Sequence, residues 1–333
     1  MKIRFEVIEY ELKVNAIHVS SNIVGGNIRL TLEYVPGTTL RGLIASRFLR
    51  YFCRNIETFV SSSCVKCESR NTCPFEKLFM NNEHGIGAYF HFGNIESDFS
   101  KSFFKGVSLN RRTKNVQIGK LFMYEVLRPL NGHLVVKSKV VIPVPKDVDI
   151  EEIGRIKKTI ENCIKLTKYA SIGGKKSWGF GLIENVSISS ISSKEHVIRE
   201  ANDTEQVINI RTRTPLPIPL HKSQDKLEKV LEKALNHIVS KVLRLPSIRI
   251  QVEEAKIEGH YEILGISSWD IKENRRREPC LAIRNGTLRL KVKINGPQII
   301  NIRDLVEMCK YTGLTISGSW YTKTGYGVVE PVL

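Results

Sequence analysis

Hydrophobic and polar residues alternate along much of the chain, in short segments separated by stretches with helical spacing. Residues 2–14 and 28–34 alternate with the two-residue period of strands, and residues 40–51 repeat apolar positions at helical spacing. Further strands are predicted at 88–92, 121–127, 134–141 and 182–189, and a helix at 150–168. With two of these strands as additions, we interpret the first part of the chain as a unit of order βαββαβ.

The same order returns after a polar segment. A strand is predicted at 207–213, an amphipathic helix at 223–243, strands at 247–257 and 287–294, and a helix at 302–311. We therefore divide the chain into an N-terminal domain at 1–190, a linker at 191–205 and a C-terminal domain at 206–333. A polar insertion that carries cysteines fills about 54–82 of the first domain.

Both halves end in a similar glycine-rich loop. Residues 179–184 read Gly-Phe-Gly-Leu-Ile-Glu, and residues 325–330 read Gly-Tyr-Gly-Val-Val-Glu, each following a predicted helix. Recurrence at corresponding places indicates a duplicated unit. The sequence thus predicts an α+β fold of two ferredoxin-like domains, each ending in a glycine-rich loop.

The charge balance favours a polyanionic partner. The chain has 51 Lys and Arg against 34 Asp and Glu, a net charge of +17, which suits nucleic acid but also fits a merely basic protein. No stretch approaches the length of an apolar membrane span, and residues 1–10 lack the apolar core of a signal peptide. We expect a cytoplasmic protein.

The two glycine loops have the chemistry of phosphate sites. Gly173 and Gly174 let the backbone approach a ligand closely, and Lys175, Lys176 and Lys323 supply positive charge. Nearby rings can stack on bases, namely Trp178, Trp320 and Tyr321. For Phe180 and Tyr326 we favour the alternative of core packing.

Two further segments carry candidate phosphate ligands. Gly37, Thr38 and Thr39 open the first helix, whose N-terminus can bind phosphate beside Arg41, although simple capping by the threonines also explains the motif. A second basic segment contains Arg111, Arg112 and Lys114. It is either an RNA contact or a solvated turn, and the same choice applies to the charged run at 272–278.

These motifs resemble those of the RAMP superfamily of CRISPR-associated proteins. The similarity lies in Val-Pro-Gly-Thr-Thr-Leu-Arg-Gly at 35–42, the Arg-Thr and Gly-Lys-Leu-Phe motifs within 109–122, and the two glycine loops. In that family the first motif opens a helix that approaches the guide RNA, and the second precedes a strand near the RNA path. The resemblance implies that the candidate ligands above bind RNA.

Within the superfamily the chain is most similar to the Cas-five-like subunit, Csx-ten type, of type III effector complexes. That subunit holds the 5′ handle of the CRISPR RNA beside the large polymerase-like subunit. The resemblance therefore implies a guide-RNA-binding structural subunit that acts in antiviral defence. Its partners would be the CRISPR RNA, the large subunit and the backbone RAMP subunits. A backbone subunit of the same complex is an alternative.

No catalytic residue is predicted. RNA-cutting backbone subunits of the Cas-seven type carry an aspartate where this sequence has Asn27, which cannot serve as a carboxylate base. The rival hypothesis is a metal-independent endoribonuclease that processes CRISPR repeat RNA with His18, Tyr34 and Lys175. A lone histidine after a strand is more often structural. We expect binding without catalysis.

The cysteines of the insertion suggest a structural zinc site. Cys64 and Cys67 form a Cys-x-x-Cys pair, Cys73 follows shortly, and Cys53 completes a set of four, with His84 or His91 as substitutes. Unrelated thiols are the alternative, because the gap from Cys53 to Cys64 is long for a zinc knuckle. The remaining cysteines, Cys163, Cys280 and Cys309, lie in apolar patterns that predict core positions.

Overall fold

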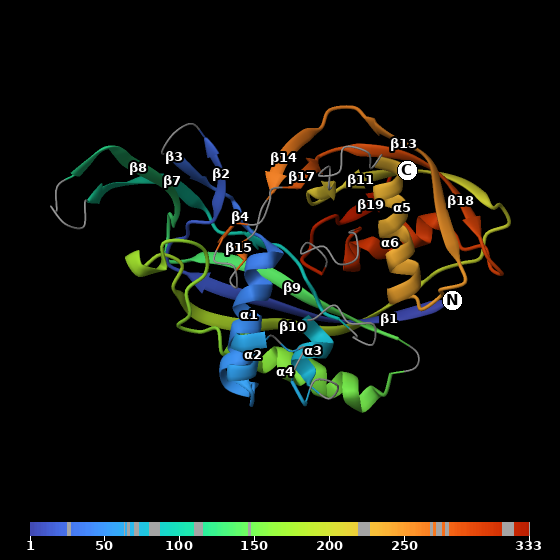
Figure 1. The fold of residues 1–333 in the computed structure, drawn as a ribbon, viewed down its shortest axis with the longest axis horizontal. Helices are drawn as coiled ribbons and strands as arrows, with labels where there is room; N and C mark the ends of the chain where they lie inside the picture. Colours follow the sequence, from blue (N-terminus) through green and yellow to red (C-terminus); the bar gives the residue numbers. More distant parts are fainter. Residues whose placement is uncertain are drawn as a thin grey trace.

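The computed structural model of the chain confirms a mixed α+β fold of several antiparallel sheets (Figure 1). The structure describes all residues except 25–27, 63, 65–66, 70–72, 80–86, 110–115, 146–147, 219–226, 267–268, 271–274, 277–279, 315–322 and 333. Most predicted elements are confirmed, with boundaries shifted by a few residues.

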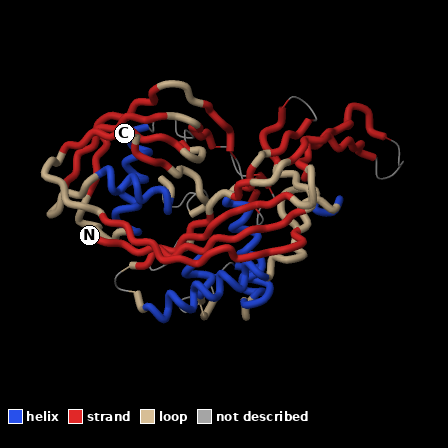
Figure 2. The backbone as a smooth tube through the Cα atoms, turned by 180° about the vertical axis from the view of Figure 1, so that it is seen from behind, coloured by secondary structure: helices blue, strands red, loops and turns tan. Residues whose placement is uncertain are grey.

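A long sheet forms the centre of the N-terminal half. Its strand order is β10 (Ile183–Val197), β1 (Lys2–Val14), β9 (Leu134–Val144), β6 (Gly93–Ile95) and β4 (Tyr34–Val35), and β5 (Tyr89–Phe90) also pairs with β9. Helices α1 (Gly37–Phe52) and α4 (Ile150–Lys165) lie on one face (Figures 1 and 2). The side chain of Asp149 caps α4 by accepting a hydrogen bond from the backbone N–H of Glu151.

A second sheet rises from one end of the first as an arm. It contains β2 (Ser20–Val24), β3 (Ile28–Thr31), β8 (Val116–Pro129) and β7 (Phe99–Leu109), and the hairpin of β7 and β8 projects outward (Figure 1). Strand β7 is absent from the sequence prediction, and β8 is twice as long as expected. The sequence Phe-Ser-Lys-Ser-Phe-Phe-Lys-Gly at 99–106 has no clean alternation, because neither face of the arm is fully buried.

The C-terminal half has a sheet of its own. The strand order is β13 (Arg249–Glu258), β18 (Thr287–Asn295), β11 (Glu205–Thr212) and β19 (Val329–Pro331), with helices α5 (Leu227–His237) and α6 (Ile302–Thr312). A π-helical turn, Ile238–Val242, continues α5. Two smaller sheets, unpredicted from sequence, contain β12 (Leu216–Ile218), β17 (Cys280–Arg284) and β14 (Glu262–Ile266), and β15 (Trp269–Asp270) and β16 (Arg275–Arg276).

Strand β1 contributes to two hydrophobic cores. Its residues Ile8, Tyr10, Leu12 and Val14 pack with α1 and α4. On the opposite face, Ile3, Phe5 and Val7 pack with residues of α5 and α6. The alternation of side chains along a strand makes this possible, since odd and even residues point to opposite faces.

The odd-numbered face of β1 changes character after Val7. Glu9, Glu11 and Lys13 follow on that face, where they are exposed or half-buried. The C-terminal half therefore covers only the first part of the strand, and the rest of this face remains accessible to solvent.

Two sequence expectations need correction. The insertion at 54–82 is not simply a polar loop, because α2 (Ile56–Ser62) and α3 (Pro74–Phe79) lie in it and the Phe75, Leu78 and Phe79 side chains are buried in the N-terminal core. The segment 191–197, assigned to a linker, continues strand β10 as far as Val197. Pairing with the first half of β1 extends it.

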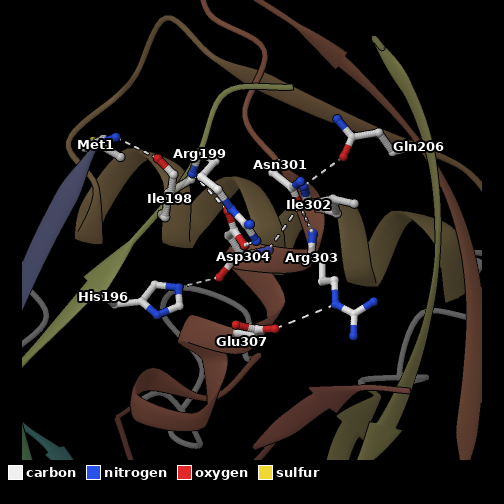
Figure 3. A network of polar contacts seen from close by, with 10 residues as sticks. All are labelled: Met1, His196, Ile198, Arg199, Gln206, Asn301, Ile302, Arg303, Asp304 and Glu307. Carbon is white, nitrogen blue, oxygen red and sulfur yellow. Dashed lines mark hydrogen bonds and ion pairs between the residues drawn. The ribbon is translucent and has the colours of Figure 1, made fainter. Parts of the chain in front are cut away.

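A buried aspartate joins the end of β10 to α6 (Figure 3). The Asp304 carboxylate accepts hydrogen bonds from the backbone N–H of Arg199 at 2.9 Å and from its guanidinium at 2.6 and 3.0 Å. His196 donates through Nε2 to the Asp304 carbonyl oxygen at 2.7 Å. Burial raises the pKa of Asp304, but the hydrogen bonds and charge of Arg199 outweigh it, so the pKa lies below its usual value.

We predict that Asp304→Asn destabilises the fold near neutral pH by about 1–3 kcal/mol, the range for a charged group in buried hydrogen bonds. Because the folded-state pKa is depressed, this stabilisation is complete above the unfolded pKa of about 4 and is lost as pH falls through the lower folded value. Urea unfolding at pH 7 and at acidic pH measures it.

Glu307→Gln is the matched control on the same helix, since Glu307 is exposed and forms an i,i+4 ion pair with Arg303. We expect it to change the free energy of unfolding by less than about 0.5 kcal/mol. Two results would show that Asp304 does not join the two halves. One is an equal effect of the two variants; the other is a difference in unfolding free energy between wild type and Asp304→Asn that does not shrink at acidic pH.

Candidate nucleic-acid interface

The two glycine-rich loops share one backbone arrangement. Gly181 and Gly327 have φ of +78° and +68°. The Gly181 carbonyl accepts a hydrogen bond from Ile172 N at 2.9 Å, and the Gly327 carbonyl accepts one from Leu314 N at 2.6 Å. A Cβ on Gly181 would lie 1.8 Å from the Ile172 oxygen, and one on Gly327 would lie 2.4 Å from the Leu314 oxygen. Only glycine fits both positions.

The surroundings of the second loop differ from those of the first, because its described residues 323–327 are buried against the N-terminal half. The Lys323 carbonyl accepts a hydrogen bond from Phe90 N at 2.9 Å. Thr324 is fully buried, and Tyr326 meets Phe92 edge-on with ring centroids 4.8 Å apart. This loop therefore joins the two halves.

Lys323, a predicted RNA ligand, lies in this interior. Lys323 is 8% exposed. Burial, followed by the charge of Arg41, lowers the pKa of its ammonium group to about 8. Arg41, the second predicted ligand here, donates from Nη2 to the carbonyl oxygen of Phe79 in α3. Both side chains are thus engaged in the packing of the insertion and the second loop.

The start of α1 packs against the same loop. A Cβ on Gly37 would lie 2.1 Å from the Thr324 carbonyl oxygen and 2.2 Å from that of Phe90. Thr38 and Thr39 are half-buried. The N-cap residue is Pro36, without a side-chain cap hydrogen bond, so the alternative of threonine at the N-cap is wrong. The glycine serves a close backbone contact at the helix N-terminus.

The first loop is open. Lys176, Trp178 and Gly179 are exposed, and nothing lies within 4 Å of a Cβ added to Gly179. At its base, Gly174 N donates to the His18 carbonyl at 2.7 Å, and a Cβ on Gly173 would lie 2.6 Å from that oxygen. These two glycines therefore pack the loop on the chain segment before β2.

Aromatic rings of the arm lie beside this loop. In the β7–β8 hairpin Phe104 pairs with Tyr124 and Gly106 with Phe122, so these residues share one face of the sheet. Trp178 lies with its ring centroid 4.9 Å from Phe104, 5.7 Å from Tyr124 and 6.3 Å from Phe122. We call these four rings, Phe104, Phe122, Tyr124 and Trp178, the aromatic platform.

Lys175 and Arg29 lie over rings of the platform, and Lys176 is on the same loop as Trp178. The Lys175 Nζ lies 4.1 Å from the ring centroid of Tyr124, 4.5 Å from that of Trp178 and 5.4 Å from that of Phe122. Arg29 lies 5.9 Å over Tyr124. Lys176 is exposed on the loop, and partial burial, followed by the charge of Arg47, lowers its pKa. Interleaved cations and rings are typical of single-stranded nucleic-acid sites.

The group suggested for RNA cleavage is only partly assembled. His18 is 2% exposed, and its Nδ1 lies 2.7 Å from the Glu125 carbonyl. Burial lowers its pKa, the nearby charges of Lys175 and Arg29 add to this, and the hydrogen bond opposes it. Tyr34 instead stacks on Phe92 at 5.0 Å, beside the second loop. The structure thus brings His18 near Lys175 without Tyr34.

Several candidate residues lie outside the described residues, and their placement stays a prediction. They are Asn27, His84, Arg111, Arg112, Lys114, Trp320, Tyr321 and most of the run at 272–278. By contrast, Phe180 and Tyr326 are 7% and 4% exposed, so their assignment to core packing is confirmed.

A family model decides the relationship of the chain. The model of the RAMP superfamily matches residues 17–184, half of the sequence. This chain belongs to the RAMP superfamily. The match contains His18, the arm and the first glycine loop, so the open interface lies inside the family region.

Comparison with solved structures gives a weaker likeness. A chain of the structure "Cryo-EM structure of the Type III-B Cmr-beta bound to cognate target RNA" has a TM-score of 0.34 and 14% identity to this RAMP protein. The likeness covers 58% of this chain and 61% of that chain. Among curated proteins, none matches the sequence.

The four cysteines of the RAMP domain's insertion gather around Cys64. Burial raises the pKa of the Cys64 thiol to about 11, and the charges of Glu76, Cys73, Cys67 and Cys53 add to it. All four are free thiols. Among the residues that the structure describes, no three metal-binding side chains form a ready-made ligand group.

The other cysteine expectations have a clearer outcome. Cys163, Cys280 and Cys309 are 1%, 3% and 0% exposed, which confirms their core positions. The sequence suggests His91 as a zinc ligand, but its Nε2 instead lies 2.9 Å from the carbonyl oxygen of Tyr311 in α6. Burial, followed by the charge of Lys139, lowers its pKa to about 3.

In the part of the chain that the structure describes, no helix is long and apolar enough to cross a membrane.

We predict opposite effects of two glycine substitutions in α1. Gly37→Ala destabilises the RAMP fold by about 1–3 kcal/mol, because its methyl group collides with two backbone oxygens that cannot give way. Gly42→Ala stabilises it by roughly 0.5–1 kcal/mol, since no atom lies within 4 Å of the added Cβ and alanine favours a helix. Thermal unfolding measures both, and similar melting temperatures would contradict the packing of the second loop on α1.

Proposed function

We propose that this RAMP protein is a guide-RNA-binding structural subunit of a type III CRISPR effector ribonucleoprotein. In this role it holds the 5′ handle of the CRISPR RNA and contacts the large polymerase-like subunit and the backbone RAMP subunits, in antiviral defence. Family membership, the net charge of +17 and the resemblance of its motifs to the Cas-five-like, Csx-ten type subunit support this proposal.

One observation carries the RNA-binding part of the proposal. The first glycine loop is open and presents Lys176 and Trp178 to solvent, beside the aromatic platform. In the second loop, which has the same backbone arrangement, the described residues 323–327 are buried. Positive charge and accessible rings in one place favour a single-stranded polyanion with planar bases.

We also propose that the two halves are ferredoxin-like units, the first of which runs to Val197 at the end of β10 and the second of which covers about 206–333. The two main sheets have the same strand order. Across the N-terminal sheet the order is β10, β1, β9 and β6, and across the C-terminal sheet it is β19, β11, β18 and β13. If inserted strands are left out, each sheet places side by side the fourth, first, third and second strand of its half of the chain. A shared strand order and shared loop geometry support duplication of one βαββαβ unit.

We propose in addition that the insertion binds a structural Zn²⁺ through Cys53, Cys64, Cys67 and Cys73. Cys64 is buried, the other three cysteines lie close enough to influence its pKa, and four thiolates are a ligand set that zinc prefers. The metal would stabilise α2 and α3, whose residues Phe59 and Phe75 pack on each other at 5.6 Å.

For zinc we predict about one equivalent of metal per chain by elemental analysis. The double substitution Cys64→Ser, Cys67→Ser removes the metal and lowers the melting temperature, because binding energy of the metal is folding energy. Cys163→Ser, a buried cysteine in α4 outside the cluster, is the control that keeps the metal. Wild-type protein purified without chelators that contains no zinc would contradict the site.

For the complex we predict that affinity-tagged protein, purified from cells with an active CRISPR locus, carries the large subunit, backbone subunits and small RNAs with a common 5′ handle. Recovery of RNA without any of these proteins would favour a free-standing RNA-binding protein.

The endoribonuclease alternative is tested by incubating the purified chain with labelled repeat RNA in EDTA. The proposed binding function gives intact RNA, and discrete cleavage that His18→Ala abolishes would establish the enzyme instead.

A further inference from the structure

We propose that the aromatic platform is a base-stacking subsite for single-stranded RNA, in which Phe104 and Trp178 receive the bases and Lys175 is a positioning residue beneath Trp178. This inference rests on the proposed RNA-binding function and assigns specific roles within that site. It departs from the sequence-based expectation that Lys175 binds phosphate.

Two rings of the aromatic platform are exposed to solvent. Phe104 and Trp178 are 39% and 38% exposed, while Tyr124 beneath them is 8% exposed. Large rings gain stability when they leave water. A cluster that is buried at its base and open at its top therefore has an unfilled apolar surface, of the kind that marks a binding site.

The backbone holds this surface in place. Lys175 has φ of +57° although it is not glycine, and Gly179 has φ of +82°. A left-handed conformation is strained for a lysine. Between these two residues the turn Lys176–Trp178 places the Trp178 ring against the arm. On the arm, a Cβ on Gly106 would lie 2.3 Å from the Phe122 ring, so that ring lies directly across the strand.

The environment of Lys175 assigns its role. Its ammonium lies within 4.1–5.4 Å of three ring centroids, which is the range of cation–π contacts. The Lys175 ammonium lies among three rings, which leave little room for a phosphate. The ammonium of the next residue, Lys176, is on an exposed side chain that a phosphate can reach. Lys175 therefore orients Trp178 and Tyr124, and Lys176 is the phosphate ligand.

The charges around the platform favour RNA over a protein partner. Among the described residues, Lys175 and Arg29 lie over the rings and Lys176 is exposed on the same loop, while the Glu125 carboxylate follows Tyr124 in the chain. Glu125 is 7% exposed, and its Oε2 accepts a hydrogen bond from Thr31 N at 3.0 Å. The accessible charge is thus positive. Bases of a duplex hide their faces in the stack, so the ligand is single-stranded.

The neighbouring Phe103 provides a matched control. It is 50% exposed, more than Phe104. It pairs with Glu125 rather than Tyr124, and the alternation of the strand places it on the opposite face of the arm from the platform. A general loss of exposed apolar surface would affect both positions equally, whereas a stacking site affects only one.

The test measures the affinity of the full-length protein for a fluorescein-labelled single-stranded 12-nucleotide RNA by anisotropy, at several salt concentrations. We expect Trp178→Leu and Phe104→Leu to weaken binding by roughly 5- to 100-fold, as for loss of one stacked base, with an unchanged salt slope. Trp178→Phe keeps most of the affinity, and Phe103→Leu has no effect. Lys176→Ala reduces the slope by about one.

Lys175→Met separates positioning from charge. If Lys175 is a positioning residue, the Lys175→Met substitution lowers the affinity for RNA but leaves its salt dependence unchanged. The substitution also changes the near-UV circular dichroism of the aromatic platform. A slope reduced as in Lys176→Ala would overturn its assigned role. Melting temperatures of all variants establish that each is folded at the assay temperature.

The outcomes distinguish this subsite from the function on which it rests. A wild-type protein that binds no single-stranded RNA overturns both. If wild type binds RNA but Trp178→Leu and Phe104→Leu bind as well as Phe103→Leu does, the subsite alone is wrong. If those two variants keep RNA but lose another subunit in tagged purification, the platform is a protein-docking face and the proposal is overturned.

Discussion

The fold depends on one strand that is buried on two faces. Strand β1 packs its even-numbered residues on α1 and α4 and its first odd-numbered residues, Ile3, Phe5 and Val7, on the C-terminal helices. Neither half can complete its core without it. The stacking of Phe5 on Tyr311 of α6, at 4.7 Å, is a direct contact of this shared core. A rigid relation between the halves follows, because a packed interior has few alternative arrangements.

This constraint explains why two loops of the same geometry have different environments. The C-terminal half sits over the beginning of β1, and its glycine loop then meets β5 and the start of α1, where Gly37 and Gly325 allow backbone to approach backbone. The N-terminal loop lies at the other end of the sheet, next to the arm. It keeps its lysine and tryptophan accessible. One of two loops with the same backbone geometry thus packs in the interior, and the other stays open, as the proposed RNA-binding role requires.

The sequence predicts the elements well where one periodicity dominates. Helices α4 and α6 and strand β18 each bury one regular face, and the matching loop endings predict the shared loop geometry. It fails where burial comes from distant residues. Nothing near Lys323 indicates that Phe90 covers its loop. Nor does the sequence around Tyr124 indicate that Trp178, far along the chain, meets it across the arm. The sequence therefore indicates Trp178 as a stacking ring but not the platform as a whole, whose local signal on the arm is the density of rings at 103–104 and 122–124.

The central claim is that RNA lies on the first glycine loop and the arm, and not on the second loop. Ultraviolet cross-linking of the purified protein to single-stranded RNA, followed by mass spectrometry of the peptides, tests it most directly. The account predicts cross-links at Phe104, Phe122 or Trp178 and none at Tyr326, which lies in the interior. Cross-links confined to the C-terminal half, with the platform peptides unmodified, would contradict it.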